Sequence, residues 1–349
     1  SGLSFVSPTL VSATQITGTV FVARDAALGT RDLVVANPRP GGGTTTISGA
    51  FAVQNPSPTV FAVSPAAGVV GQSLVVEIAG TDFLSTMSGV DFGADISTSA
   101  VTIDSTGTHL TARITIAPSA TAGLRNVTVT NPGPGGGTSA LPSGFTVENL
   151  APTLMSLSAY AAGRGQTVNV TLAGTNFAIG ITTASFGDNI TLNSLKVSSP
   201  SSAIANITVA AGASIGAHTV NVTNPPPGGG TAVLANVFNV VNPAPTLVSI
   251  APAGGARGQS LDIVINGTGF VSGVSAPTLG SDITVNSFTV TGFKQINANI
   301  TIAFAGAAGA RDVTVVNGTP GGGSVLLAGG FTVNNPVPTL SSLSHTNAN

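Results

Sequence analysis

Apolar and polar residues alternate in short runs along the whole chain. Between Gln72 and Gly80 the apolar positions include Leu74, Val76 and Ile78. Because successive side chains of a strand point to opposite faces, a period of two predicts strands with one buried face. No window of ten or more residues has the period of an amphipathic helix. Similar alternation occurs in three further runs: Leu110, Ala112, Ile114 and Ile116; Leu124, Val127 and Val129, around a short irregularity; and Phe145 and Val147.

Turn-forming residues separate these runs at intervals of about ten residues. The 349 residues include 45 Gly and 22 Pro, and Asn and Ser are also frequent between the runs. Short alternating strands with such punctuation are typical of antiparallel sandwiches. The sequence therefore predicts an all-β protein whose units each hold about seven short strands in two sheets around one small core.

Three strings recur with one period, so the chain is a repeat array. The first two strings each recur at spacings of 94, 93 and 93 residues: Pro-Gly-Gly-Gly at Pro40, Pro134, Pro227 and Pro320, and Asn-X-X-Pro-Thr at Asn55, Asn149, Asn242 and Asn335. The third string runs from Gly-Gln to Gly-Thr-X-Phe and covers Gly71–Phe83, Gly165–Phe177 and Gly258–Phe270.

The period divides the chain into three complete units and two partial ones. We name them as follows: the head segment (1–54), the C-terminal part of an incomplete repeat; repeat A (55–148); repeat B (149–241); repeat C (242–334); and the tail segment (335–349), the opening strand of a further repeat. Proline-containing links such as Asn55–Thr59 begin the units. Proline fixes φ and restricts the preceding residue, so we expect extended, semi-rigid links and a linear rod with incomplete units at both ends.

Several motifs resemble those of the IPT/TIG family of immunoglobulin-like domains. They are Pro-Thr-Leu-X-Ser, Gly-Thr-Asn-Phe (Gly174–Phe177), Phe-Gly (Phe186, Gly187), Arg-Asn-Val-Thr-Val-Thr-Asn-Pro (Arg125–Pro132) and Gly-Phe-Thr-Val (Gly144–Val147). The resemblance implies immunoglobulin-like sandwiches along the whole chain, as in surface receptors, some transcription factors, bacterial surface proteins and glucan-acting enzymes. The repeated Pro-Gly-Gly-Gly and the scarcity of charge depart from the family pattern, and the basic loops of its DNA-binding members are missing.

Composition narrows the possible environments and partners. Charged residues make up 6% of the chain and apolar residues 42%, which excludes charge-rich disorder. No run of about 18 uncharged apolar residues occurs, so no membrane-spanning segment is expected. The net charge is −2, and the ten Lys and Arg are scattered, which argues against nucleic acid as a partner. The absence of Cys excludes disulfides and thiolate metal sites. These features favour an extracellular or cell-surface location.

The head segment contains only the later strands of a unit. Its expected inward positions are Val20, Val22, Leu33, Val35, Phe51 and Val53, and the earlier strands that would cover them are absent from it. Leaving such side chains in water costs about 1.5–3 kcal/mol each. We therefore expect an assembly surface formed in the head by these residues and Leu3 and Phe5, and in the tail by Leu340 and Leu343.

Two sources for the missing cover stay open. In the first, the tail of one subunit adds to the head of the next and gives a head-to-tail homopolymer. The unit completed at each joint then lacks only the counterpart of Arg257–Gly280. In the second, the chain is a window of a longer array, and neighbouring repeats supply the strands.

The candidate chemical groups do not form a recognisable reactive site. A phosphate loop leads into a helix and usually carries Lys, whereas Gly41–Gly43 leads into a strand, so we interpret this loop and its copies as tight connections with positive φ. No residue is assigned a catalytic, cofactor-binding or metal role, and we expect a protein that is not an enzyme. The groups considered are the histidines His109, His218 and His345, and the acids Asp82, Asp91, Asp95 and Asp104.

Eight Asn-X-Ser/Thr triplets are candidate glycosylation sites, although an Asn- and Thr-rich strand surface also produces such triplets by chance. Those at Asn169, Asn206, Asn221 and Asn299 lie between inward apolar neighbours and are expected on outer faces. The other four triplets begin at Asn126, Asn189, Asn266 and Asn317.

The sequence favours a structural subunit of an extracellular filament, sheath or surface layer. Its alternatives are an adhesin stalk or carbohydrate- or ligand-binding array, and the non-catalytic region of a large secreted protein. No cofactor is expected under any of them.

Overall fold

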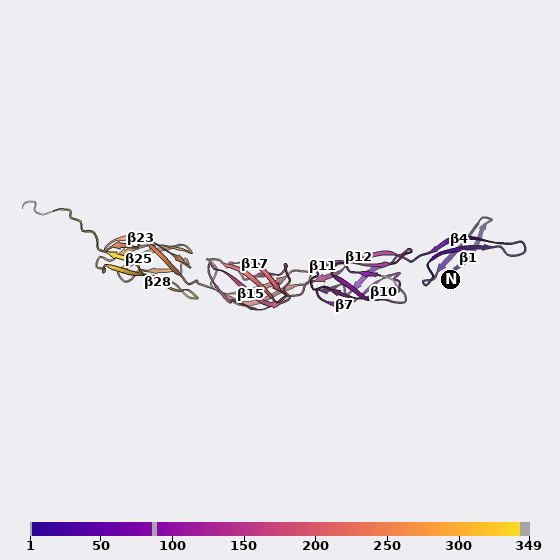
Figure 1. Cartoon of the computed structure of the whole chain (residues 1–349), viewed down its shortest axis with the longest axis horizontal. Coiled ribbons are helices and arrows are strands. Elements are labelled where there is room, and N and C mark those ends of the chain that lie inside the picture. Colours follow the sequence, from indigo (N-terminus) through magenta and orange to yellow (C-terminus); the bar gives the residue numbers. More distant parts are fainter. Residues whose placement is uncertain (1, 86–88, 343–349) are drawn as a thin grey trace, which may run out of the picture. The chain divides into compact units, whose positions relative to one another are not determined.

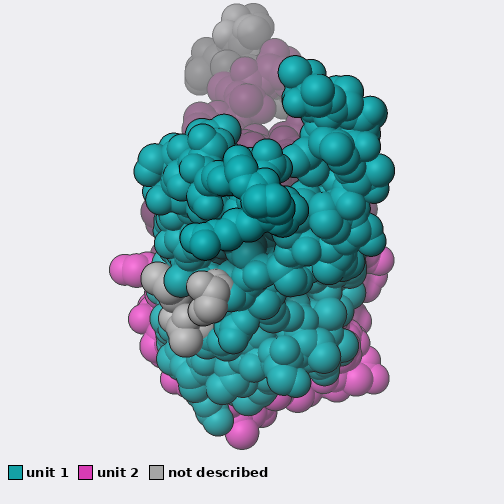
Figure 2. Space-filling model, turned by 90° about the vertical axis from the view of Figure 1, so that its right-hand side faces the viewer, with its two compact units in different colours: residues 1–150, 226–228 teal, residues 151–225, 229–349 magenta. Residues whose placement is uncertain are grey.

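The computed structural model describes residues 2–85 and 89–342. These residues form strands and connecting loops without any helix (Figure 1). They divide into two compact units, one of residues 1–150 with 226–228 and the other of residues 151–225 with 229–349, which Figure 2 colours separately. Each unit is described by itself.

The head segment consists of two separate antiparallel hairpins. The first pairs β1 (Leu3–Ser12) with β2 (Gln15–Val22), and the second pairs β3 (Gly29–Ala36) with β4 (Thr44–Val53). Within residues 2–85 and 89–342, neither hairpin pairs with a third strand. Almost every residue of the four strands is exposed.

Repeat A is a sandwich of two four-stranded sheets with the orders β5-β7-β10-β9 and β6-β12-β11-β8. Its strands are β5 (Thr59–Ser64), β6 (Ala67–Val69), β7 (Ser73–Thr81), β8 (Gly89–Asp91), β9 (Ile96–Ile103), β10 (His109–Ile116), β11 (Gly123–Asn131) and β12 (Gly137–Glu148).

Repeats B and C have the same topology as repeat A. The strands of repeat B are β13 (Thr153–Leu157), β14 (Ala161–Gly163), β15 (Thr167–Thr175), β16 (Thr183–Ser185), β17 (Ile190–Ser199), β18 (Ser202–Val209), β19 (Gly216–Asn224) and β20 (Gly230–Val241). Those of repeat C are β21 (Thr246–Ala251), β22 (Gly254–Ala256), β23 (Ser260–Thr268), β24 (Ala276–Thr278), β25 (Ile283–Gly292), β26 (Gln295–Ile302), β27 (Gly309–Asn317) and β28 (Gly323–Asn334).

Each complete repeat has eight strands rather than the expected seven, because its first strand is divided between the two sheets. In repeat A, β5 pairs antiparallel with β7, whereas β6 pairs parallel with β12 in the other sheet. The same division occurs at β13 and β14 and at β21 and β22. The opening segment of a repeat therefore joins both halves of its sandwich.

The alternating residues fill the cores as predicted. Leu110, Ala112, Ile114 and Ile116 of β10 are fully buried. Phe145 of β12 meets Phe92 edge to face, with ring centroids 5.3 Å apart, an arrangement favoured by the ring quadrupoles. Each repeat has its own cluster of buried side chains.

The prediction for Leu124 is wrong. Burial alternates without a break along β11, with Arg125, Val127 and Val129 on the inner side, so Leu124 lies on the outer side. Val127 and Val129 are buried, whereas Leu124 is 63% exposed. The pairing shift between Arg125 and Val127 places the extra residues in β12, not in β11.

The Pro-Thr and Gly-Thr-X-Phe strings meet in the folded repeat. The Thr59 hydroxyl lies 2.6 Å from that of Thr81, and the same threonine pair occurs in repeats B and C. The Thr59 carbonyl approaches Gly80 so closely that any Cβ there would clash. Phe83, the last residue of the string, is fully buried. The two strings thus fix the register of β5 on β7.

A buried asparagine holds the opening link of a repeat. In repeat C, the Nδ2 of Asn317 donates to the carbonyls of Pro243 and Gly269, at 2.7 Å each, and its Oδ1 accepts from Ser275. The amide is 2% exposed. Asn131 of repeat A makes the corresponding bonds to Pro56 and Asp82. The side chain satisfies carbonyls that would otherwise lie unpaired in the interior.

No helix among the described residues is long and apolar enough to cross a membrane.

Replacing Asn317 with Leu should destabilise repeat C, because the two carbonyls lose their donor within the folded interior. We expect the free energy of unfolding of this repeat to fall by about 2–4 kcal/mol. Hydrogen exchange of repeat C peptides in the whole chain, followed against urea, measures the change. Asn297→Leu, on the exposed side of β26, is the matched control. Equal effects of the two substitutions would contradict the assigned role of Asn317.

Candidate functional site

The head segment exposes the side chains that a complete repeat buries. Its strands β1 to β4 align with β25 to β28 of repeat C at a constant offset of 280 residues. Val20 and Phe51 are each 40% exposed, whereas their counterparts Ile300 and Phe331 are completely buried. The head therefore presents an open core, which we define as the inward face of these four strands.

Most of the predicted head residues lie on this open face. Leu3 is half-buried and Val53 is 4% exposed, so Val53 departs from the uncovered state expected for it. The exposed members are Phe5, Val20, Val22, Leu33, Val35 and Phe51. Their counterparts Ile300, Ile302, Val313, Val315 and Phe331 are fully buried, and the counterpart of Phe5, Val285, packs against the core of repeat C.

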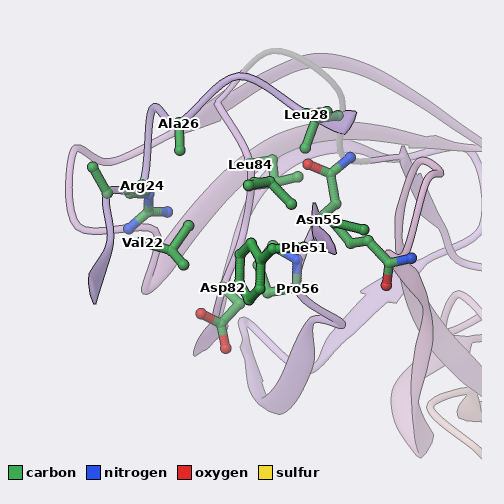
Figure 3. Close-up of a pocket in the computed structure, with 13 residues that line it drawn as sticks. Val22, Arg24, Ala26, Leu28, Phe51, Asn55, Pro56, Asp82 and Leu84 are labelled. Atoms are coloured by element: carbon green, nitrogen blue, oxygen red, sulfur yellow. The ribbon is translucent and has the colours of Figure 1, made fainter. Parts of the chain in front are cut away.

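A cavity of about 610 Å³ lies at the base of the open core (Figure 3). Val22, Leu28 and Phe51 contribute apolar walls from the head, and Asn55 and Asp82 line it from repeat A. In repeat C the counterparts of Val22 and Phe51 are covered within the complete sandwich. The strands β21 to β24, which belong to that sandwich, have no counterparts in the head. The cavity thus lies where the open face of the head meets the opening link of repeat A.

Gly18 makes room for Phe5 on the open face. A Cβ at Gly18 would clash with the Phe5 ring. The counterparts of Gly18 are Ala112, Ala205 and Ala298 in the complete repeats, where the smaller side chains of Thr98, Leu192 and Val285 take the place of the ring. The head is therefore adapted locally, and is not simply a copy of the later strands.

The described part of the tail segment, residues 335–342, forms no strand, although its sequence matches the opening strands of the repeats. Leu340 is 82% exposed and Val337 is also exposed. The counterparts of Leu340 are Val60, Leu154 and Leu247, of which Val60 and Leu154 are buried and Leu247 packs against the core of repeat C. Leu343, the other predicted tail residue, lies outside the described residues.

The Pro-Gly-Gly-Gly loops have the positive φ angles expected of tight connections. Gly41, Gly135, Gly228 and Gly321 all have φ between 66° and 82°, and each loop contains a cis peptide bond before its proline. The loops also do something the sequence did not indicate, since each complete repeat uses its loop to hold its own opening asparagine.

This contact, which we call the clasp, consists of backbone hydrogen bonds and one side-chain bond. In repeat A, the amide of Asn55 donates to the Pro134 carbonyl at 2.8 Å, and the Gly136 amide donates to the Asn55 carbonyl at 2.7 Å. The Asn55 Nδ2 donates to the Pro132 carbonyl at 2.8 Å. Asn242 of repeat C makes the equivalent three bonds to Pro320, Gly322 and Gly318. In repeat B, the Asn149 amide donates to the Pro227 carbonyl.

His218 takes over the contact of an arginine. Arg125 and Arg311 donate to the carbonyls of Thr121 and Ala307, four residues earlier, and His218 lies 3.1 Å from the corresponding carbonyl of Ser214. His218 therefore holds the same loop as its arginine counterparts.

The acids of repeat A cap their own turns. The Asp91 carboxylate accepts from the Gly93 amide, and Asp82 accepts from the Thr81 hydroxyl. Among the described residues, no three His, Cys, Asp or Glu side chains lie close enough together to hold a metal ion. Asp95 has positive φ in its loop.

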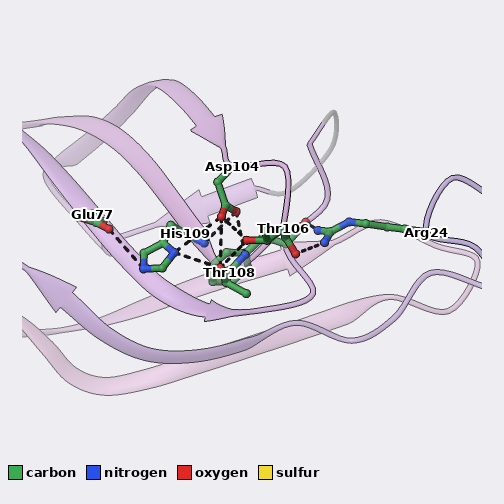
Figure 4. A network of polar contacts seen from close by, with 7 residues as sticks. Arg24, Glu77, Asp104, Thr106, Thr108 and His109 are labelled. Atoms are coloured by element: carbon green, nitrogen blue, oxygen red, sulfur yellow. Dashed lines mark hydrogen bonds and ion pairs between the residues drawn. The ribbon is translucent and has the colours of Figure 1, made fainter.

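The most connected acid is Asp104, in the turn before β10 (Figure 4). It accepts from the Thr106 hydroxyl and from the amides of Thr108 and His109. These bonds, that of Thr106 above all, hold the pKa of the Asp104 carboxyl well below its usual range. The His109 ring lies 3.6 Å from Glu77 and 3.8 Å from Asp104. The network stabilises a turn.

The candidate glycosylation sites differ in accessibility. Asn126, Asn169 and Asn189 are exposed, whereas Asn206, Asn221, Asn266 and Asn299 are half-buried. The four expected on outer faces alternate with inward neighbours, as in Ala205, Asn206 and Ile207. Asn317 is the exception, because its Nδ2 is engaged by two carbonyls in the interior. A glycan cannot reach Asn317 in the folded repeat.

No protein-family model and no curated protein matches the chain. Among solved structures, the Escherichia coli adhesin FdeC is 17% identical over 80% of this chain and 96% of its own, with a TM-score of 0.25. An I-band fragment of titin is 8% identical over 82% and 98%, with a TM-score of 0.32. An ectodomain fragment of ICAM-5 is 12% identical over 82% and 80%, with a TM-score of 0.30. These likenesses concern the fold alone. The chain is a series of tandem immunoglobulin-like β-sandwiches.

Removing the Asp104 carboxylate should loosen the turn before β10 in a pH-dependent way. Because the pKa of the Asp104 carboxyl is lower in the folded chain than in the unfolded chain, the carboxylate stabilises the fold at pH values above its ordinary pKa of about 4. This contribution is lost as the pH falls through the lowered pKa. Asp104→Ala should therefore speed amide exchange of residues 104–109 at pH 7, with the difference narrowing below pH about 4. Asp188→Ala, at an exposed carboxylate in repeat B, is the control. A difference that persists unchanged at low pH would contradict the role of the carboxylate.

Proposed function

We propose that the chain is a structural subunit of an extracellular filament, sheath or surface layer, in which the tail segment of one copy covers the open core of the next. One observation carries the proposal: the head exposes apolar side chains whose counterparts in repeat C are buried. Joining unlike ends of identical chains gives a heterologous contact, which propagates rather than closes.

The energetic argument rests on the exposed members of the open core. Burying an apolar side chain of this size contributes about 1.5–3 kcal/mol. Phe5, Val20, Val22, Leu33 and Phe51 are all at least 40% exposed. Covering several of them would contribute free energy comparable to the stability of a small domain. The open core is therefore a strong candidate for a surface that is covered in use.

The tail has the sequence that such a cover needs. Pro338, Thr339 and Leu340 repeat the Pro-Thr-Leu string that opens repeats B and C. In each of those repeats this string forms the first strand of a sandwich and packs against its core. Among the described residues Leu340 is 82% exposed, and in the proposed assembly it packs into a second copy.

The composition supports a location outside the cell and a mechanical role. The outer strand positions carry mainly Ser, Thr and Asn, and only 6% of residues are charged. The strings shared with IPT/TIG domains have structural tasks here, since they fix a strand register and bury Phe83, Phe177 and Phe270. We therefore assign the repeats to an IPT/TIG-like type and expect no catalysis.

A ligand-binding array or adhesive stalk is the second candidate, and the outer faces of repeats B and C favour it. In repeat B, Asn193 donates to Asn206 at 2.7 Å, and Asn206 donates to Asn169 at 2.6 Å. Repeat C has the same ladder in Asn286, Asn299 and Asp262. A ladder of amides across three strands is a neutral hydrogen-bonding surface, suited to polar ligands such as sugars. Adhesion is the activity stated for FdeC.

The substitution Leu340→Asp should abolish self-association of the whole chain without lowering its thermal stability. Leu340 is exposed in its own chain, but a carboxylate placed in the open core of a second copy would lose its hydration. Sedimentation of the 33.9 kDa chain across a concentration series measures the effect. The control is Met155→Asp, because Met155 is similarly exposed but lies on a completed repeat.

We expect the wild-type chain and Met155→Asp to form species that grow with concentration, and Leu340→Asp to remain monomeric. A wild-type chain that stays monomeric at all concentrations would overturn the assembly proposal and leave the binding array as the better account.

A further inference from the structure

The clasps of the complete repeats share one geometry. The carbonyl of the opening asparagine lies against the first glycine of the Pro-Gly-Gly-Gly loop. A Cβ on Gly135, Gly228 or Gly321 would come within 2.5–2.6 Å of the carbonyl oxygen of Asn55, Asn149 or Asn242. An isolated parallel bridge joins the same residue pairs. Glycine is therefore required at this position for a steric reason in addition to its φ angle.

The head segment contains a related loop, in which Gly41 has the positive φ of its counterparts but Gly42 and Gly43 do not. The Asn37 amide donates to the Gly43 carbonyl at 2.9 Å, the counterpart of the pairing between Asn317 and Gly323. Gly42 approaches the carbonyls of Asn37 and Pro38 as closely as Gly322 approaches those of Asn317 and Gly318. The loop is thus closed by the same backbone hydrogen bond as its counterparts, and docking would bring Gly42 and Gly43 to the positive φ of the seated loops.

The head loop differs from the others in having no asparagine seated on it. Among the described residues, no atom lies within 4 Å of a Cβ built on Gly41. Asn37, the counterpart of the buried Asn317, is exposed. Within the described part of the chain its side chain makes no hydrogen bond, whereas that of Asn317 donates to two carbonyls.

The tail segment has the sequence of the missing occupant. Asn335, Pro336, Pro338 and Thr339 match Asn242, Pro243, Pro245 and Thr246 position by position. Asn335 and Pro336 are exposed. Asn242 and Pro243 are the residues that occupy the clasp and meet the buried asparagine of repeat C.

We propose that the loop Pro40–Gly43, together with Asn37, is a docking site for Asn335–Pro336 of a second copy of this chain. This inference rests on the proposed assembly and specifies how its register is set. The Asn335 amide donates to the Pro40 carbonyl, and the Gly42 amide donates to the Asn335 carbonyl. The Asn335 Nδ2 donates to the Pro38 carbonyl, and the Asn37 Nδ2 donates to the Pro336 carbonyl.

The docking site fixes where the tail begins to cover the open core. A strand that slips by one residue turns its apolar side chains to the wrong face. Anchoring Asn335 determines the placement of Leu340 five residues later, as Asn242 does for Leu247 in repeat C. The incoming Asn335 and Pro336 are uncharged and offer no charged partner to Arg39, which precedes Pro40 in the loop, so docking should change little between low and high salt.

The test uses Gly41→Asn in the whole chain. Asparagine tolerates positive φ, so the loop keeps its shape, but its side chain occupies the place of the incoming Asn335 carbonyl. We expect self-association to weaken by at least about 30-fold, from the lost hydrogen bonds and the clash. Asn335→Ala removes one side-chain bond and should weaken association by about fivefold.

The control is Gly49→Asn, which makes the same change at another positive φ. Its counterpart in repeat B is Asn236, with φ of 56°, so the fold accepts the substitution there. Association of this variant should equal that of the wild type. Sedimentation gives the association constants, and circular dichroism shows that all variants keep their strands.

The outcomes separate the two proposals. If the wild-type chain associates, Leu340→Asp prevents this, and Gly41→Asn associates as well as Gly49→Asn, then the docking site is wrong and the assembly proposal stands. If the wild-type chain does not associate, both are overturned. If Gly41→Asn loses association and Gly49→Asn keeps it, the docking site is supported.

Discussion

The structure depends on closing an apolar sandwich from both sides. In each complete repeat the opening segment pairs first with one sheet and then with the other. In repeat C, β21 pairs with β23 and β22 pairs with β28. In repeat C the opening Asn242 is held in the clasp. The buried Asn317 donates both to Pro243, the residue after Asn242, and to Gly269 in the loop after β23. Backbone carbonyls in these links are satisfied by amides rather than by charge, in keeping with a chain that has few ions.

The head segment shows what remains when this closure is absent. Its hairpins β1–β2 and β3–β4 have the register of a complete repeat, including the shift between Arg31 and Leu33, and its loop has the closing hydrogen bond between Asn37 and Gly43. What it lacks is the covering layer, not local structure. Hairpins that already have their strand pairing lose little conformational entropy when a further strand is added to them, which is in line with the proposed assembly.

Much of this architecture could be predicted from the sequence, because periodicity and spacing are local signals. Alternating runs such as Leu110–Ile116 predict the strands, and the 93-residue period predicts the bounds of the units. The division of the first strand between two sheets depends on pairing between distant segments, which alternation does not encode. The burial of Asn317 could not be predicted for the same reason. An Asn-X-Ser/Thr triplet has the same sequence whether its Asn lies on an outer face or beneath a link. In each complete repeat an Asn lies three residues before the Pro-Gly-Gly-Gly string, at 131, 224 and 317. This recurrence is the signal in the sequence that could have indicated the role of Asn317.

The most direct measurement of the central claim is amide exchange of the head segment as a function of protein concentration. If a second copy covers the open core, protection of β1 to β4 rises with concentration while that of the cores of repeats A to C stays constant. Equal protection of the head in dilute and concentrated solution would show that the inward faces of β1 to β4 need no second chain, and would contradict the account.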